Sequence, residues 1–135
     1  MLESNNIQSR GFQNVYSGNK IIGFQIKLKT SYYRGIFLSQ FRPVDPGPFV
    51  VKVDGEEFKG NQITLTIEGK TYQQKDFQSL SKVYWPIDEL ALLTISKPGG
   101  LQAGTHDVEV SWSYSQCYEV EDASQNYTAK RVLIQ

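Results

Sequence analysis

Cysteine and histidine are almost absent from the chain, which has one of each among its 135 residues. A single cysteine, Cys117, excludes an internal disulfide and favours a reducing compartment, and we expect it to be a small buried residue. A zinc site of ordinary composition would need more of these ligands than the chain contains. A hydrolytic triad would have to use His106, but the adjacent Asp107 points to the opposite face of a strand. We therefore expect His106 to hydrogen-bond to a turn, and we predict no metal site and no cofactor site in this chain.

A surplus of charge of one sign is also missing, because 14 lysine and arginine residues balance 14 aspartate and glutamate residues. Nucleic acids and anionic membranes bind concentrated positive charge, so neither is an expected partner. Apolar runs long enough to span a bilayer are missing as well, and Met1–Asn6 lacks the basic and apolar parts of a signal peptide. These absences predict a soluble cytoplasmic protein, and the length predicts one domain over residues 1–135.

Helical periodicity is scarce, and alternation of apolar and polar residues takes its place. The clearest example places apolar side chains on one face and polar ones on the other: Ile22, Phe24, Ile26 and Leu28 against Gln25, Lys27 and Lys29. A period of two is typical of strands with one buried face. About nine short strands, with turns roughly every 8 to 12 residues, predict an all-β fold, a single antiparallel β-sandwich. Immunoglobulin-like, Greek-key and jelly-roll connectivities are left open.

The same alternation predicts the core, which we expect to contain Phe24, Ile26, Leu28, Val51, Ile63, Leu65, Leu93, Val108, Val110 and Trp112. Residues 49–73 are predicted to form a meander with hairpin turns at Asp54-Gly55 and Glu68-Gly69. Residues 74–90 are predicted to be a loop with one short helical turn beginning near Pro86. The glycine-rich segment 97–104 lacks a P-loop ending and is predicted to be a wide turn, and a loop at 119–126 precedes a terminal strand.

Side chains that could carry out catalysis are in short supply. Adjacent carboxylates occur at three places that we predict to be turns or loops: Glu56-Glu57, Asp88-Glu89 and Glu121-Asp122. Acids adjacent in sequence rarely form an acid–base pair across a substrate, so solvated acids are the better interpretation. The sequence therefore predicts no catalytic residue in this chain. A hydrolase acting alone would need a site that the sequence does not contain.

Aromatic residues are plentiful by contrast, at 13% of the chain, which exceeds what a small sandwich needs for its core. Tyr32, Tyr33 and Arg34 form a turn between two strands, where small polar residues are usual. Tyrosine and arginine are enriched where one protein covers another. We predict a partner-binding surface composed of Tyr32, Tyr33, Arg34, Tyr84 and Trp85. For the turn, the alternative is a cap on one end of the sandwich, with Arg34 paired to a local acid.

Several fragments taken together resemble one family: Gly11–Val15, Gly23–Gln25, Tyr32–Ile36 with Leu38 and Ser39, Val53–Gly55, and Lys97–Leu101 with Gly104, His106, Val108 and Val110. They resemble the small β subunit of bacterial C-glycoside deglycosidases, and the resemblance runs nearly from end to end. The specificity lies in the combination, above all Tyr-Tyr-Arg-Gly with Pro-Gly-Gly-Leu.

The resemblance implies a non-catalytic β subunit in a heteromer, and a higher-order heteromer is compatible with it. In that family a larger α subunit, a TIM barrel with a divalent Mn or Mg ion, does the chemistry. It cleaves the carbon–carbon bond between a sugar oxidised at its 3-position and an aromatic, flavonoid-type aglycone. Tyr32–Arg34 would then lie at the mouth of the barrel. The alternative is a stand-alone carbohydrate-binding sandwich that uses exposed aromatic rings as a stacking platform.

Overall fold

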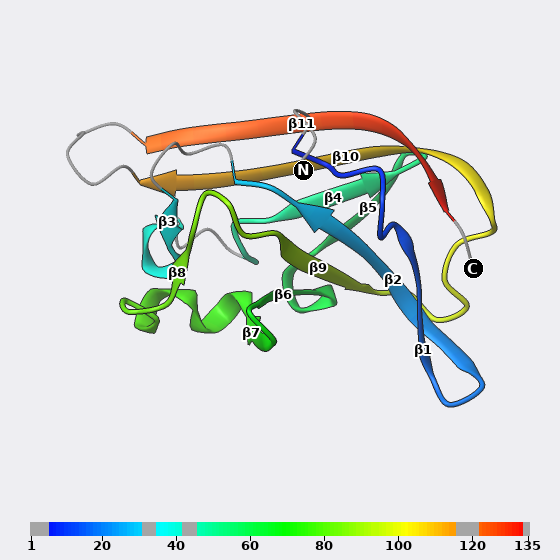
Figure 1. Cartoon of the computed structure of the whole chain (residues 1–135), viewed down its shortest axis with the longest axis horizontal. Coiled ribbons are helices and arrows are strands. Elements are labelled where there is room, and N and C mark those ends of the chain that lie inside the picture. Colours follow the sequence, from blue (N-terminus) through cyan, green and yellow to red (C-terminus); the bar gives the residue numbers. More distant parts are fainter. Residues whose placement is uncertain (1–5, 31–34, 42–45, 116–121, 134–135) are drawn as a thin grey trace.

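Two antiparallel sheets lie one above the other, as Figure 1 shows. The computed structural model describes residues 6–30, 35–41, 46–115 and 122–133, with the backbone only for 113–115 and 122–127. The predicted all-β sandwich is therefore confirmed. Within the described residues, the helical segments are short 3-10 turns, and none has the length and apolar character needed to cross a bilayer.

The strands are divided between the sheets in an order that differs from their order along the chain. The five-stranded sheet contains, from edge to edge, β1 (Gln13–Ser17), β2 (Lys20–Leu28), β9 (Ala91–Ser96), β6 (Ile63–Ile67) and β7 (Lys70–Gln73). The four-stranded sheet contains β11 (Asp122–Leu133), β10 (Gly104–Ser115), β4 (Val50–Val53) and β5 (Glu56–Lys59). A separate two-stranded ribbon contains β3 (Ile36–Phe37) and β8 (Tyr84–Trp85). In the part of the chain that the structure describes, three 3-10 helices connect strands: η1 (Leu38–Gln40), η2 (Gly60–Gln62) and η3 (Gln74–Ser79).

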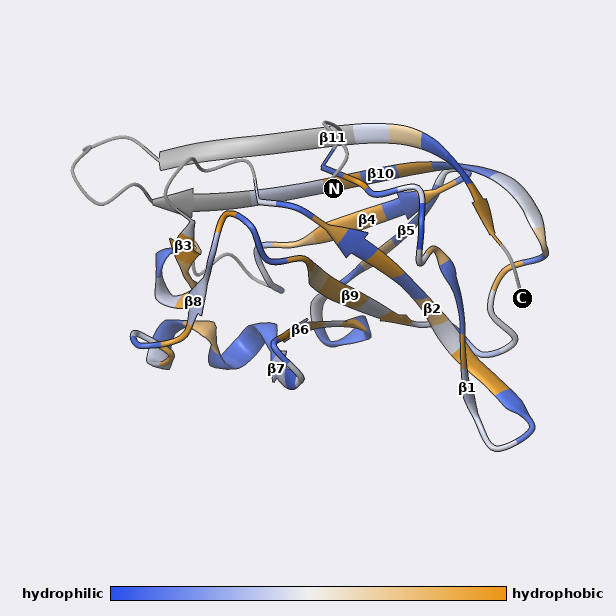
Figure 2. Ribbon diagram, viewed as in Figure 1, coloured by the Kyte–Doolittle hydropathy of each residue, from blue (hydrophilic) through white to orange (hydrophobic). Residues whose placement is uncertain are grey.

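The core lies between the sheets and contains all ten of the side chains predicted for it, each of them buried. Figure 2 shows hydrophobic positions concentrated in β9 and alternating with hydrophilic ones along β2. Ile22, which alternation places on the same face as Phe24, has 45% of its surface exposed, so its predicted burial is wrong. The reason is that this end of β2 projects from the sandwich as the β1–β2 hairpin, where no strand of the other sheet covers it (Figure 1).

Both predicted hairpin turns are confirmed, but the predicted meander is wrong. Asp54 and Glu68 have φ angles of 50° and 51°, and each is followed by a glycine with positive φ, as type I′ turns require. Between the two hairpins, however, the chain leaves the four-stranded sheet at η2 and enters the other sheet. Gly60, with φ +65°, makes the departure possible.

A buried glutamine holds this crossing in place. The side-chain oxygen of Gln74 accepts a hydrogen bond from the Phe49 N–H at 2.7 Å, and its nitrogen donates to the Gly60 carbonyl at 2.8 Å. One amide therefore ties the start of β4 to η2 and to η3. These contacts join residues far apart in the sequence, which explains why a local pattern could not predict the crossing.

Two other sequence predictions need correction. The helical segment within residues 74–90 is η3, which lies before the predicted position near Pro86. At Pro86 the chain forms a single turn, in which the Glu89 N–H donates to the Pro86 carbonyl at 3.2 Å. The buried ring of Phe77 anchors η3. The loop predicted at 119–126 is a strand from Asp122 onward, because β11 pairs with β10 along its whole length and ladder hydrogen bonds outweigh the polar composition. The segment 97–104 is a turn, as predicted.

Candidate partner-binding surface

The ribbon of β3 and β8 lies at one end of the sandwich and follows the predicted Tyr-Tyr-Arg turn. Tyr32, Tyr33 and Arg34 lie outside the described residues, so their predicted role is untested. The next residue, Gly35, has φ +78°, and a Cβ there would lie 2.5 Å from the Trp85 carbonyl oxygen. The glycine of Tyr-Tyr-Arg-Gly is therefore required by the close approach of β8.

Trp85 belongs to the core. Its side chain is fully buried, its ring centroid lies 6.2 Å from that of Trp112, and its indole N–H donates to the Glu89 carbonyl at 2.8 Å. A buried, satisfied indole offers no surface to a partner, so the inclusion of Trp85 in the partner-binding set is corrected. The sequence could not separate Trp85 from Tyr84, because a two-residue strand is too short for alternation to be read.

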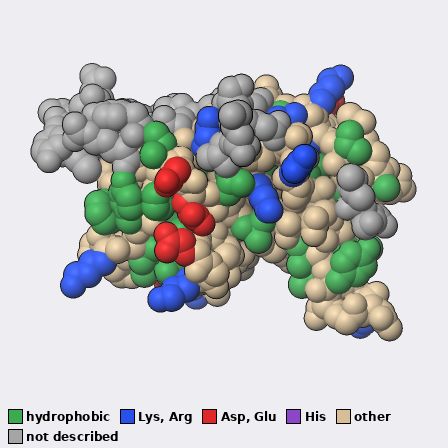
Figure 3. All heavy atoms as spheres, in the orientation of Figure 1, with side chains coloured by type: hydrophobic (Ala, Val, Ile, Leu, Met, Phe, Trp, Pro, Cys, Tyr) green, Lys and Arg blue, Asp and Glu red, His purple; other side chains and the backbone are tan. Residues whose placement is uncertain are grey.

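Tyr84 is exposed and stands beside another exposed aromatic residue, Phe37. The two residues pair across the β3–β8 ribbon, their ring centroids are 4.9 Å apart, and each is 38% exposed. Ile87, in the turn after β8, is 42% exposed. We call these three residues the β3–β8 patch. On the face in Figure 3, hydrophobic side chains gather over β3 and β8, with acidic side chains beside them.

His106 is held by hydrogen bonds on both ring nitrogens, as the prediction of a turn-binding histidine requires. Nδ1 lies 2.6 Å from Oδ2 of Asp54, and Nε2 lies 2.7 Å from the Gln102 carbonyl oxygen. A carbonyl oxygen and an ionised carboxylate both accept hydrogen bonds, so this arrangement favours the protonated ring, which donates from both nitrogens. A cation with both protons engaged cannot serve as a general base.

The pKa values of this pair shift in opposite directions. Burial alone would lower the pKa of His106, but the hydrogen bonds to Gln102 and Asp54, together with the charge of Asp54, raise it overall. The hydrogen bond from His106, followed by that from the Asp107 N–H, lowers the pKa of Asp54. The acid that orients the His106 ring is therefore Asp54, which is 52 residues away in the sequence. Apart from the position of Asp54 in a turn, no sequence signal links the two residues.

The glycine-rich turn is built around a buried amide. Asn14 donates to the Leu101 carbonyl at 2.8 Å and accepts from the Leu101 N–H at 2.9 Å, as a neighbouring strand would. Gly100 has φ +61°, and a Cβ there would overlap the Asn14 side chain. The Pro-Gly-Gly-Leu motif is thus explained by the packing of this turn against β1.

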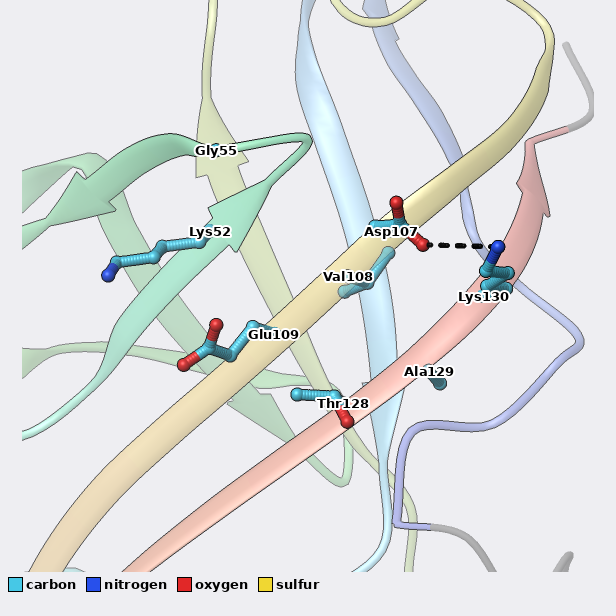
Figure 4. A pocket seen from close by; sticks show the side chains of 8 residues that line it. All are labelled: Lys52, Gly55, Asp107, Val108, Glu109, Thr128, Ala129 and Lys130. Carbon is cyan, nitrogen blue, oxygen red and sulfur yellow. Dashed lines mark ion pairs between the residues drawn. The ribbon is translucent and has the colours of Figure 1, made fainter.

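The outer face of the four-stranded sheet contains a shallow cavity of about 290 Å³ (Figure 4). Its charges are paired across strands: Asp107 lies 4.0 Å from Lys130, and Lys52 lies 4.0 Å from Glu57 on β5. All four side chains are well exposed, so these pairs contribute little to stability. This surface is a solvated sheet face with balanced charge.

The adjacent carboxylates form no acid–base pair where the structure describes them. Glu56 binds the Lys97 ammonium group with both oxygens, at 3.2 and 3.3 Å, and Glu57 binds Lys59 at 3.2 Å. Over the described ranges, no cluster of three or more histidine, cysteine or acidic residues is placed to hold a metal ion. Cys117 and Glu121 lie outside those ranges.

Comparisons with known proteins give one consistent result. The family model described as C-glycoside deglycosidase beta subunit matches residues 2–118. A protein of Eubacterium cellulosolvens named C-glycoside deglycosidase beta subunit is 40% identical over 118 residues, which cover 87% of this chain and 77% of that protein. The fragments that carried the resemblance, Tyr-Tyr-Arg-Gly and Pro-Gly-Gly-Leu, lie within the matched range. The chain therefore belongs to the C-glycoside deglycosidase beta subunit family.

Proposed function

We propose that this chain is a non-catalytic subunit that binds and supports a catalytic α subunit. The α subunit would be a metal-dependent TIM barrel, with Mn or Mg, that cleaves the carbon–carbon bond of 3-oxo-C-glycosides with aromatic, flavonoid-type aglycones. The family membership supports the assignment as a beta subunit. The observation that carries the binding role is the β3–β8 patch, since exposed paired aromatic rings are typical of surfaces that a partner covers.

The proposed interface combines the patch with the turn that precedes it. Tyr32, Tyr33 and Arg34 are joined to β3 through Gly35, and the Tyr84 hydroxyl lies against that glycine. Tyr84 therefore lies next to the residue at which the described chain resumes after Arg34. In this arrangement Trp85 supports the ribbon from the core, and the partner contacts Tyr84, Phe37 and the turn. The interface would lie at the mouth of the α-subunit barrel, where TIM-barrel active sites are found.

The stand-alone sugar-binding alternative is weaker on the same geometry. A stacking platform needs an open, flat ring face, whereas the Phe37 and Tyr84 rings are inclined by 52° and contact each other. A partner surface can fill such an uneven patch with side chains of its own.

The first prediction tests the patch by mutation in co-expressed α and β subunits. The double change Phe37→Ser, Tyr84→Ser should weaken assembly by about 2–4 kcal/mol and lower the activity of the complex, because it removes the proposed aromatic anchors. Affinity is measured by biolayer interferometry and the size of the complex by light scattering. The isolated wild-type chain should have no lyase activity.

A matched control is Val132→Ser on β11 of the four-stranded sheet. It removes an apolar side chain that is 54% exposed outside the patch, and it should leave assembly unchanged. Normal assembly of the double variant would overturn the proposed interface. A wild-type chain that stays monomeric beside the α subunit, but is retained on a sugar column, would overturn the proposed function in favour of the stand-alone module.

A further inference from the structure

A groove of about 370 Å³ lies between the β6–β7 hairpin and β8, directly next to the β3–β8 patch. Tyr72 and Tyr84 are among its walls, and Lys70, Lys82 and Glu68 also line it. Tyr72 is half-buried and packs against the core, which fixes its ring as a wall of the groove. Tyr84 belongs to both the groove and the patch, so a partner that covers the patch reaches the groove.

The lysines of this groove differ from those on the four-stranded sheet. There, Lys52, Lys59 and Lys130 each lie within 4.0 Å of a carboxylate. In contrast, Lys70 and Lys82 form no ion pair with any residue that the structure describes, Glu68 included. Both are exposed, so the groove has two ammonium groups available for an incoming carboxylate.

The charges around the β3–β8 patch are distributed unevenly. Acidic side chains lie beside the patch on the face in Figure 3, but the groove lining holds two lysines and a single glutamate. An asymmetric charge distribution around an apolar anchor sets the orientation in which a partner can bind, because the reversed orientation brings like charges together. An acidic segment is therefore the charge-complementary occupant of this groove.

We propose that this groove docks an acidic segment of the catalytic α subunit, with carboxylates on Lys70 and Lys82 and an apolar side chain between Tyr72 and Tyr84. This inference rests on the proposed function, since it assigns a second contact to the same partner. The tyrosine rings would exclude water from the ion pairs, which strengthens charge-assisted hydrogen bonds relative to exposed ones. Docking here would fix the orientation of the α subunit on the β3–β8 patch.

The second prediction is that charge reversal in the groove weakens assembly. The double variant Lys70→Glu, Lys82→Glu should bind the α subunit about 10- to 100-fold more weakly at low salt, because two attractive contacts become repulsive. The affinity of the wild-type complex should fall as salt rises, and that of the variant should not. Both are measured by biolayer interferometry with purified α subunit.

Two further variants make the result decisive. Arg10→Glu, Lys20→Glu reverses two exposed cations that do not line the groove and should bind like wild type. Lys70→Ala, Lys82→Ala removes the cations without adding charge and should weaken binding by a smaller factor.

Wild-type affinity in both groove variants would overturn the docking proposal. If Phe37→Ser, Tyr84→Ser still weakens assembly in that case, the proposed function stands without the groove. If wild type itself fails to bind the α subunit, both proposals are wrong.

Discussion

At the scale of single residues, Asp54 connects three segments of the described chain. Its Oδ1 accepts the Asp107 N–H at 2.9 Å while Oδ2 binds His106, and its own N–H donates to the Asp107 carbonyl at 2.9 Å. His106 continues the connection to Gln102 in the glycine-rich turn. The β4–β5 turn, the start of β10 and the preceding loop are thus joined through one ion pair. We therefore assign His106 a structural role.

The third prediction concerns pH. The raised pKa of His106 means that its contribution is complete below the pKa of the unfolded histidine, about 6.5, and is lost as the pH rises through the folded value. The lowered pKa of Asp54 means that its contribution is present above about pH 4 and is lost as the pH falls through the folded value. The stability lost in His106→Gln should therefore be largest between about pH 4 and pH 6.5.

Urea unfolding of wild type and His106→Gln at pH 3, 5.5 and 9 checks this dependence. Asp54→Asn is the matched variant, because it keeps the size of the side chain and removes the charge, and it should give the same pH profile. A loss of stability that stays constant from pH 3 to pH 9 would show that His106 acts through packing on Phe12 and not through the ion pair.

The fourth prediction concerns Asn14. Asn14→Asp keeps the shape of the side chain but places a carboxylate against the Leu101 carbonyl, where the amide donates a hydrogen bond. The expected loss is more than about 2 kcal/mol at pH 7, because a buried charge would lack a donor on that side. Asn61→Asp, at an exposed position in η2, should cost less than about 0.5 kcal/mol. Equal losses in urea unfolding would refute the role of Asn14.

At the scale of elements, β10 connects the four-stranded sheet to the rest of the core. It lies between β11 and β4, and its Trp112 packs against Phe49 at 5.5 Å and Trp85 at 6.2 Å between ring centroids. Trp112 thereby joins the four-stranded sheet to the β3–β8 ribbon. The stability of the proposed interface should depend on this contact, because the ribbon has two residues in each strand.

The fifth prediction is that Trp112→Ala costs about 3–5 kcal/mol of unfolding free energy, since it leaves a cavity beneath β8. Trp112→Phe should cost less, because most of the ring contact is retained. Unfolding is followed by circular dichroism in urea. A loss below about 1 kcal/mol for the alanine variant would place Trp112 outside the core.

The sequence predicted those elements whose signal is local. Alternation identifies β2 and β10, and Asp54-Gly55 identifies a hairpin, because each depends on neighbours along the chain. Three failures have long-range causes. Ile22 is exposed because its end of β2 extends beyond the opposite sheet. Trp85 is buried because Trp112 packs against it. The crossing at Gly60 depends on a hydrogen bond from Gln74. Of the two exposed rings that pair across the β3–β8 ribbon, the sequence singled out Tyr84 but not Phe37, because the pairing joins strands far apart in the chain.

At the scale of the whole molecule, residues from both ends of the described chain contact each other. Ile7 forms a bridge with Leu28 at the end of β2, and the Arg131 guanidinium donates two hydrogen bonds to the Ile7 carbonyl, at 3.1 and 2.6 Å. The segment around Ile7 therefore contacts both sheets, through β2 of the five-stranded sheet and β11 of the four-stranded sheet. The β3–β8 ribbon and the β1–β2 hairpin lie at opposite ends of the molecule in Figure 1, so the proposed interface leaves the hairpin free.

The order of strands in the five-stranded sheet has a consequence for synthesis on the ribosome. Phe24 in β2 pairs with Ile95 in β9, so β2 leaves the ribosome with β1 as its partner and with its other edge unpaired. At 5–20 residues per second, about 4–14 seconds pass before β9 is made. During this interval a strand with the apolar face of Phe24, Ile26 and Leu28 can pair with another nascent chain. The yield of folded protein should therefore rise when translation of the intervening segment is fast or when a chaperone holds that edge.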